Sequence, residues 1–173
     1  MKALVIYESM FGNTEYIARA IAGGLARYAD VEVHDVRSVP HAATDEVPLI
    51  VAGGPTHAFS MSRPATRDDA ARQGAQLGDH AVGLREWLAE LHPARHGAQV
   101  ATFDTRVGKM RHLPGSAAKS ASRAVRGLGY GAADKPHSFY VSETPGPLLA
   151  GELERACEWG AALGSELHHR SLV

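Results

Sequence analysis

The chain contains very little cysteine and few aromatic residues. Its 173 residues include one cysteine, Cys157, and only 6% are aromatic. A single cysteine excludes an internal disulfide framework. That absence is typical of proteins in a reducing compartment, so we predict a cytoplasmic protein. Cys157 falls on the apolar stripe of the last expected helix, where we expect it to pack in the core.

The sequence also lacks long apolar runs and an excess of charge of either sign. No run approaches the roughly 18 apolar residues of a membrane span, and no basic-then-apolar leader opens the chain, so we expect neither a span nor a signal peptide. The formal net charge of −1 argues against a nucleic-acid-binding surface, which is normally basic. A length of 173 residues with 45% hydrophobic residues suits one domain, residues 1–173, with a substantial core.

Strand patterns alternate with helix patterns along the chain. Apolar or alternating runs predict strands at 2–8, 31–36, 48–53, 98–103 and 138–141. Apolar residues at three- and four-residue steps predict helices that begin near 15 and 63, at 84–92 and 116–127, and from about 149 onward. Thr66 and Asp69 have the spacing of a helix capping box. This order predicts an α/β fold, a three-layer sandwich around a five-stranded parallel sheet, with the second strand at an edge.

One short loop after the first strand has the composition of an anion-binding site. It reads Ser9-Met10-Phe11-Gly12-Asn13-Thr14 and leads directly into the first helix. A helix N-terminus has backbone N–H groups without partners and a favourable dipole for an anion, while Gly12 permits backbone conformations that a Cβ would forbid. The loop therefore predicts a phosphate site. The alternative is an ordinary strand-to-helix turn in which Asn13 or Thr14 caps the helix.

The pattern Ser-x-x-Gly-Asn-Thr resembles the FMN-phosphate loop of flavodoxins. A second stretch, VAGGPTH at 51–57, resembles the flavodoxin loop that follows the third strand and flanks the flavin ring. The resemblance implies the sheet order 2-1-3-4-5. It also places the ligand crevice between the first and third strands, outside their carboxyl ends. It implies FMN as the cofactor.

The resemblance assigns three loops to FMN. Residues 9–14 are expected at the phosphate. The other two loops are expected to flank the isoalloxazine ring, and their residues are Pro55, Thr56, His57, Ala58 and Phe59 in one, and Phe103, Asp104, Thr105 and Arg106 in the other.

The chain departs from flavodoxins in these loops. Neither ring loop contains the Trp or Tyr that often stacks on the flavin, so His57 and Phe59 are the available substitutes; alternatively, Phe59 is a local core residue. Five cations lie on or beside the loops, and a cation near the reduced ring should raise its reduction potential. They suggest a second anion, such as a nicotinamide dinucleotide or an acidic partner. The five are Arg63, Arg67, Arg106, Lys109 and Arg111.

Metal and hydrolase chemistry are not indicated. His92 and His96 stand four apart, but Pro93 between them should end a helix, and we expect no metal site. No Ser/His/Asp order is evident, and we expect no catalytic acid or base because a flavin would carry the chemistry.

Three functions remain open. The first is an electron-transfer flavodoxin, although the near-neutral charge lacks the acidic field that steers flavodoxins onto basic partners. The second is a small FMN-dependent reductase of a quinone or similar acceptor, with NAD(P)H as the donor. The third is a fold relative that has lost FMN and acts as a binding module.

Overall fold

The protein is built around a twisted parallel sheet. The computed structural model describes residues 1–75, 81–95 and 97–172. Four long strands lie in the order β2-β1-β3-β5, with parallel pairing throughout. Their bounds are β1 (Lys2–Tyr7), β2 (Asp30–Asp35), β3 (Leu49–His57) and β5 (Gln99–Val107).

The fifth strand position is filled by two pieces. The segments β6 (Gly131–Ala132) and β7 (His137–Val141) both pair in parallel with β5, the first near its start and the second along its carboxyl half. The predicted parallel order is therefore confirmed. The piece β6 was not predicted, because two exposed residues leave no apolar pattern in the sequence.

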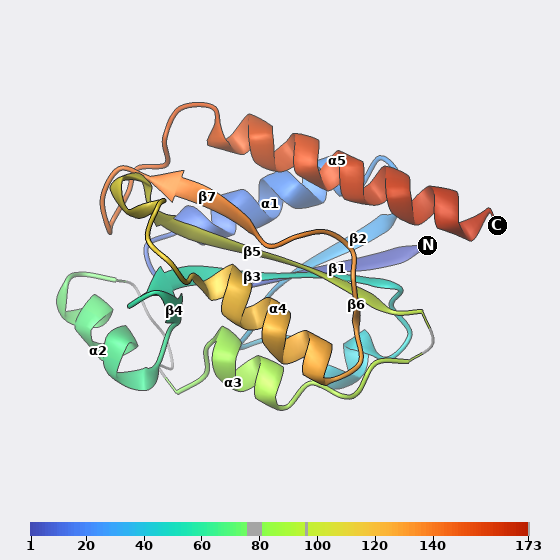
Figure 1. Ribbon diagram of the computed structural model, residues 1–173, viewed down its shortest axis with the longest axis horizontal. Helices are drawn as coiled ribbons and strands as arrows, with labels where there is room; N and C mark the ends of the chain where they lie inside the picture. Colours follow the sequence, from blue (N-terminus) through green and yellow to red (C-terminus); the bar gives the residue numbers. More distant parts are fainter. Residues whose placement is uncertain (76–80, 96, 173) are drawn as a thin grey trace.

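Helices cover both faces of the sheet (Figure 1). One face packs against α1 (Asn13–Leu25) and α5 (Glu152–Ser171), and the other against α3 (Leu84–Ala89) and α4 (Ala117–Gly127). Each face has its own buried apolar cluster, which confirms the three-layer sandwich. The helix α2 (Pro64–Arg72) lies at the carboxyl ends of the strands, and short 3₁₀ helices occupy His41–Thr44 and Gly108–Met110.

The helices α1 and α5 approach each other closely at glycines. A Cβ added to Gly24 would lie 1.9 Å from the carbonyl oxygen of Cys157, and one added to Gly160 would lie 2.0 Å from that of Ile21. The two backbones are thus in direct contact. Cys157 itself is only partly buried, so its expected place in the core is wrong.

Several expected boundaries differ from the structure. The strands β3 and β5 run through residues 55–57 and 104–107, which the sequence presented as loops. They extend because they pair with each other as far as Pro55 and Thr105, and beyond that point β3 pairs with Ser60–Met61 and β5 with Tyr140 and Val141. The helix α3 ends at Ala89 rather than at 92.

The predicted Thr66–Asp69 capping box is also wrong. Thr66 is at the third helical position, where its hydroxyl accepts from the Arg63 N–H at 2.9 Å and donates to the Arg63 carbonyl at 3.0 Å.

Two negative expectations concern the described part of the chain. No helix there is long and apolar enough to cross a bilayer. No cluster of three His, Cys, Asp or Glu side chains suited to a metal occurs among those residues either. His92 is paired with Asp45 at 2.8 Å, while His96 lies outside the described residues.

Candidate cofactor site

The loop at residues 9–14 ends at the N-terminus of α1 with several free backbone donors. Gly12 is the N-cap residue, with φ of 90° in the left-handed region, and because it has no side chain it makes no capping hydrogen bond of its own. The Glu15 N–H donates to the Ser9 hydroxyl at 3.3 Å. The N–H groups of Gly12, Asn13 and Thr14 have no acceptor within the described residues. This arrangement suits an anion, and the alternative in which Asn13 or Thr14 caps the helix is wrong.

The side chains of this loop tie it to its surroundings. The Thr14 hydroxyl is buried and lies 2.7 Å from the Thr105 hydroxyl at the end of β5. The Asn13 amide donates to the Pro145 carbonyl at 3.2 Å, in the loop that follows β7. The loop is therefore positioned from two sides before any ligand arrives.

A cavity of about 330 Å³ opens beside the loop at the carboxyl ends of the strands. It gathers most of the predicted site residues, namely Met10, Phe11, Asn13, Thr14, Pro55, Thr56, His57, Ala58, Phe59, Thr105 and Arg106. Residues that sequence reasoning did not assign also line it, and they are Thr66, Asp69, Ala70 and Gln73 near α2 with Val107, Met110, Val141 and Thr144. Val107 and Met110 belong to the stretch 103–111 that the sequence placed at the crevice, whereas the residues near α2, Val141 and Thr144 come from segments that meet it only in the folded chain.

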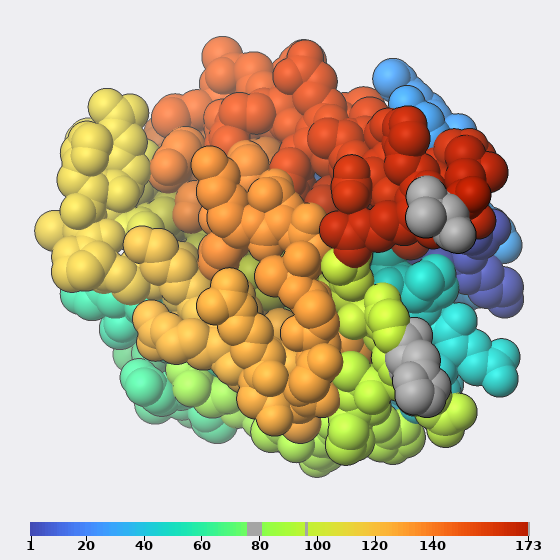
Figure 2. Space-filling model, turned by 45° about the vertical axis from the view of Figure 1, so that its right-hand side comes forward, coloured from blue at the N-terminus to red at the C-terminus, as the bar shows by residue number. Residues whose placement is uncertain are grey.

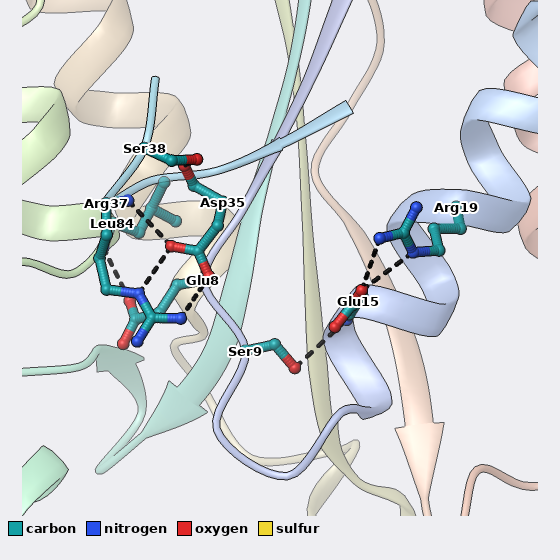
Figure 3. A network of polar contacts seen from close by, with 8 residues as sticks. All are labelled: Glu8, Ser9, Glu15, Arg19, Asp35, Arg37, Ser38 and Leu84. Carbon is teal, nitrogen blue, oxygen red and sulfur yellow. Dashed lines mark hydrogen bonds and ion pairs between the residues drawn. The ribbon is translucent and has the colours of Figure 1, made fainter. Parts of the chain in front are cut away.

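A second cavity, of about 420 Å³, lies on the other side of the same loop. Ser9 and Gly12 line this one rather than the first. Two ion pairs flank it, Glu15 with Arg19 at 2.7 Å and Asp35 with Arg37 at 2.6 Å. Figure 3 shows Ser9 between them. The charges around this cavity neutralise each other locally.

Two predicted site residues have side chains in the core. Phe103 is fully buried and packs edge-on against Phe139 and Trp159 on the α1–α5 side. Asp104 is also fully buried on the opposite face, where its carboxylate accepts from the Ala118 N–H at 2.9 Å. Burial raises the pKa of the Asp104 carboxyl. The structure places neither side chain at the cavity.

Arg106 lines the cavity and holds the neighbouring loop. Its guanidinium donates to the carbonyls of Gly115 at 3.2 Å, Met110 at 2.5 Å and Leu113 at 3.4 Å. Its buried Nε–H has no acceptor within the described residues. A buried donor without a partner is unfavourable unless a bound group satisfies it.

The β3–β4 hairpin presents Phe59 at the cavity. The strand β4 (Ser60–Met61) pairs antiparallel with the end of β3, leaving Ala58 and Phe59 as a two-residue turn. Both have positive φ, 46° and 64°, as hairpin turns of this length require. Phe59 is 45% exposed, so its placement as a local core residue is wrong. Burial lowers the pKa of His57, which favours its neutral form.

Replacing Ala58 by glycine should stabilise the protein. Alanine in the left-handed region costs about 1 kcal/mol, which glycine avoids, and part of the gain is offset by the more flexible unfolded chain. We expect the free energy of unfolding, measured with urea, to rise by about 0.5–1 kcal/mol. The control is Ala162→Gly at an exposed position of α5, which should lower it by about 1 kcal/mol. A fall in both variants would mean that the turn is unstrained.

A buried polar network lies next to the loop at residues 9–14. The Glu8 carboxylate accepts from the Ser62 hydroxyl at 2.5 Å and the Leu84 N–H at 2.7 Å; Figure 3 labels Glu8 and Leu84. Arg67 donates to Ser62 at 2.7 Å and pairs with Glu86 at 3.1 Å. Burial raises the pKa of Glu8. Arg67 is 1% exposed, so its expected place among the cations near the ligand is wrong. The one sequence feature that pointed to this network was Glu8, a carboxylate that directly follows the apolar run of the first strand.

Comparison with known proteins identifies the fold. No protein-family model matches the chain, and no curated protein matches it either. Solved structures do match. A flavodoxin from the domain Archaea aligns with a TM-score of 0.67 at 20% identity, covering 98% of this chain and all of that one. The Streptococcus pneumonia TIGR4 flavodoxin aligns with 0.65 at 18% identity, covering 98% and 99%.

A larger protein contains a similar part. The Flv1 flavodiiron core from Synechocystis sp. PCC6803 aligns with a TM-score of 0.65 at 18% identity over 98% of this chain, which spans 36% of that chain. These alignments, together with the strand order, show that the chain has the flavodoxin fold.

Proposed function

We propose that this protein binds FMN in the first cavity and uses it to transfer electrons. The observation that carries the proposal is the set of backbone N–H groups at Gly12, Asn13 and Thr14, which have no acceptor among the described residues and lie next to a cavity lined by Arg106. The backbone N–H groups match a phosphate, and the Arg106 side chain would place a positive charge beside the ring carbonyl oxygens. Both fit the acceptors that FMN carries.

The residues around the cavity have separate roles in this proposal. The N-terminus of α1 holds the phosphate, with the Thr14 hydroxyl kept in place by Thr105. Phe59 and His57 supply flat surfaces for the ring, and the neutral imidazole adds no charge there. When bound, FMN would supply one- and two-electron redox chemistry, while the protein positions it and tunes its potential.

Several further points are part of the same proposal. The whole chain acts as one domain, since every wall of the cavity arises from one sheet and its connections. The single cysteine favours the cytoplasm. The positive charge of Arg106 at the cavity should raise the reduction potential of the ring. The free N–H groups argue against a fold relative that has lost FMN.

A small FMN-dependent reductase is the second candidate. The cavity extends past the hairpin to Thr66, Asp69 and Gln73 near α2, and these polar groups could contact a quinone or a nicotinamide. Oxidation of NAD(P)H by the FMN-loaded protein, with a quinone as acceptor, would favour this candidate over an electron shuttle.

Flavin titration tests the proposal. The flavin-free protein should bind FMN at least about 100-fold more tightly than riboflavin, because two charge-assisted hydrogen bonds to the phosphate are worth about 3–6 kcal/mol. Quenching of flavin fluorescence measures both affinities. Equal affinities would show that contacts with the ring, and not with the phosphate, supply the binding energy, which would contradict the assignment of the 9–14 loop. If neither flavin binds, the protein is a fold relative without FMN.

A further inference from the structure

Exposed apolar side chains gather at the mouth of the first cavity. Phe59, Met110, Leu113 and Leu149, which we call the mouth patch, are 40–45% exposed. They come from the hairpin, the 108–115 loop and the segment before α5. Large apolar groups at this exposure on adjoining segments are typical of a surface that another molecule covers.

The three segments of the mouth patch are in contact. A Cβ added to Gly115 would lie 2.6 Å from the Phe59 carbonyl, and one added to Gly108 would lie 3.2 Å from Leu149 Cδ1. Figure 2 shows the 108–115 segment, in yellow, at the outer edge of the molecule. The patch is therefore one continuous surface at the mouth of the proposed flavin site.

Cations alternate with the apolar residues of the 108–115 loop. Lys109 and Arg111 are exposed, and neither has a carboxylate within ion-pair distance in the described part of the chain. The Arg111 guanidinium donates to the His112 ring at 3.2 Å. Among the described acidic residues, Asp69 lines the first cavity, where it pairs with Arg72 at 2.7 Å, and Glu143 after β7 is exposed. The 108–115 loop itself contains no acidic residue, so its charge is positive.

Hydrogen bonds from the Arg106 side chain and within the backbone fix the conformation of the 108–115 loop. Arg106 donates to three of its carbonyl groups, and two backbone bonds, Arg111 N–H to Gly108 and Leu113 N–H to Met110, close its turns. Burying a guanidinium without an ion pair is costly. Because these bonds already order the exposed loop, it loses little conformational entropy when a partner binds, and this favours binding.

We propose that the mouth patch docks an acidic protein that exchanges electrons with the flavin, with Lys109 and Arg111 facing its carboxylates. The inference rests on the proposed FMN function. A protein partner fits better than a small anion, because the apolar groups span three segments and the two cations lie on the outer surface. In each encounter one electron leaves the reduced partner and enters the flavin. Two encounters with two solvent protons complete its reduction.

Stopped-flow kinetics with a defined probe tests this inference. The probe is an acidic plant-type [2Fe–2S] ferredoxin, whose low reduction potential allows it to reduce the FMN-loaded protein. Its rate constant should fall about tenfold between 20 and 200 mM salt, as attraction of opposite charges requires. Basic cytochrome c, as oxidant of the reduced protein, should show a rate constant that rises or stays level over the same range.

Two variants and a control separate local from global charge. The double variant K109E/R111E should react about tenfold more slowly with the ferredoxin at low salt. The control R27E/R126E makes the same change in net charge just after α1 and at the C-terminal end of α4, away from the first cavity. It should change the rate less than about twofold. Leu113→Ser should raise the ferredoxin concentration at which the rate is half-maximal by about fivefold and leave the salt dependence of the rate unchanged.

The outcomes are distinguishable. FMN affinity is measured first for every variant, and a wild-type protein that binds no FMN contradicts the proposed function. If all variants bind FMN equally but the loop charges leave the ferredoxin rate unchanged, or the control lowers it as much, the docking inference is overturned and the proposed function stands.

Discussion

Replacing Gly24 by alanine is expected to lower the free energy of unfolding by about 3 kcal/mol or more. The added methyl group would meet the Cys157 carbonyl at 1.9 Å and the Ala161 backbone nitrogen at 2.7 Å. Both are backbone atoms of α5, so no side chain can move aside, and the two helices must separate. Urea unfolding followed by circular dichroism measures the loss.

The preceding residue supplies a matched control. Gly23 lies in the same helix, and a Cβ there would meet nothing within 4 Å. Gly23→Ala should therefore raise the free energy of unfolding by about 0.5–1 kcal/mol through better helix propensity. If the two variants were equally stable, the α1–α5 contact would be looser than the structure indicates.

The double variant G12A/T14V should lose FMN affinity by about 100-fold or more. A Cβ at φ of 90° costs about 1–2 kcal/mol in the present backbone conformation, so the loop should rearrange and its N–H groups should no longer converge. The Thr14 hydroxyl, which bonds to Thr105, is removed as well. Flavin fluorescence titration measures the change.

Riboflavin and a second glycine provide the controls. Because riboflavin lacks the phosphate, its affinity should change less than about threefold in the same variant. Gly129→Ala alters another positive-φ glycine, after α4 at the far end of the sheet, and should leave FMN affinity unchanged. If the double variant retained its FMN affinity, or riboflavin affinity fell in parallel, the phosphate assignment would be contradicted.

Much of the first cavity could be predicted from sequence because its walls are the carboxyl ends of β3 and β5 and the turns next to β1, β3 and β5, which carry local signals. The polar stretch 9–14 between a strand and a helix is such a signal, and so is the run of small residues within β3. The neighbours of these segments could not be predicted. Thr66, Asp69 and Gln73 line the same cavity, but only the path of the chain after the hairpin brings α2 there.

The charged residues show most clearly what could not be predicted from the sequence. Arg67 and Arg106 read alike in the sequence, as cations near ligand loops. In the structure Arg67 bonds to Ser62 and pairs with Glu86 in the core, beside the Glu8 carboxylate, while Arg106 holds the 108–115 loop. Each role depends on acceptors that belong to other parts of the chain. Asp104 differs from Arg106 for the same reason, since its partner is the N-terminus of α4.

The sequence by itself determined the alternation of strands and helices, the parallel sheet and the position of the loop at residues 9–14. These follow from apolar periodicity and from glycine or polar residues at turns, which act over a few neighbouring residues. Tertiary structure alone decided how far β3 and β5 extend, which charged side chains are buried, and that α1 and α5 meet at Gly24 and Gly160. Those features depend on contacts between residues far apart in the chain, and a local pattern carries no information about such partners.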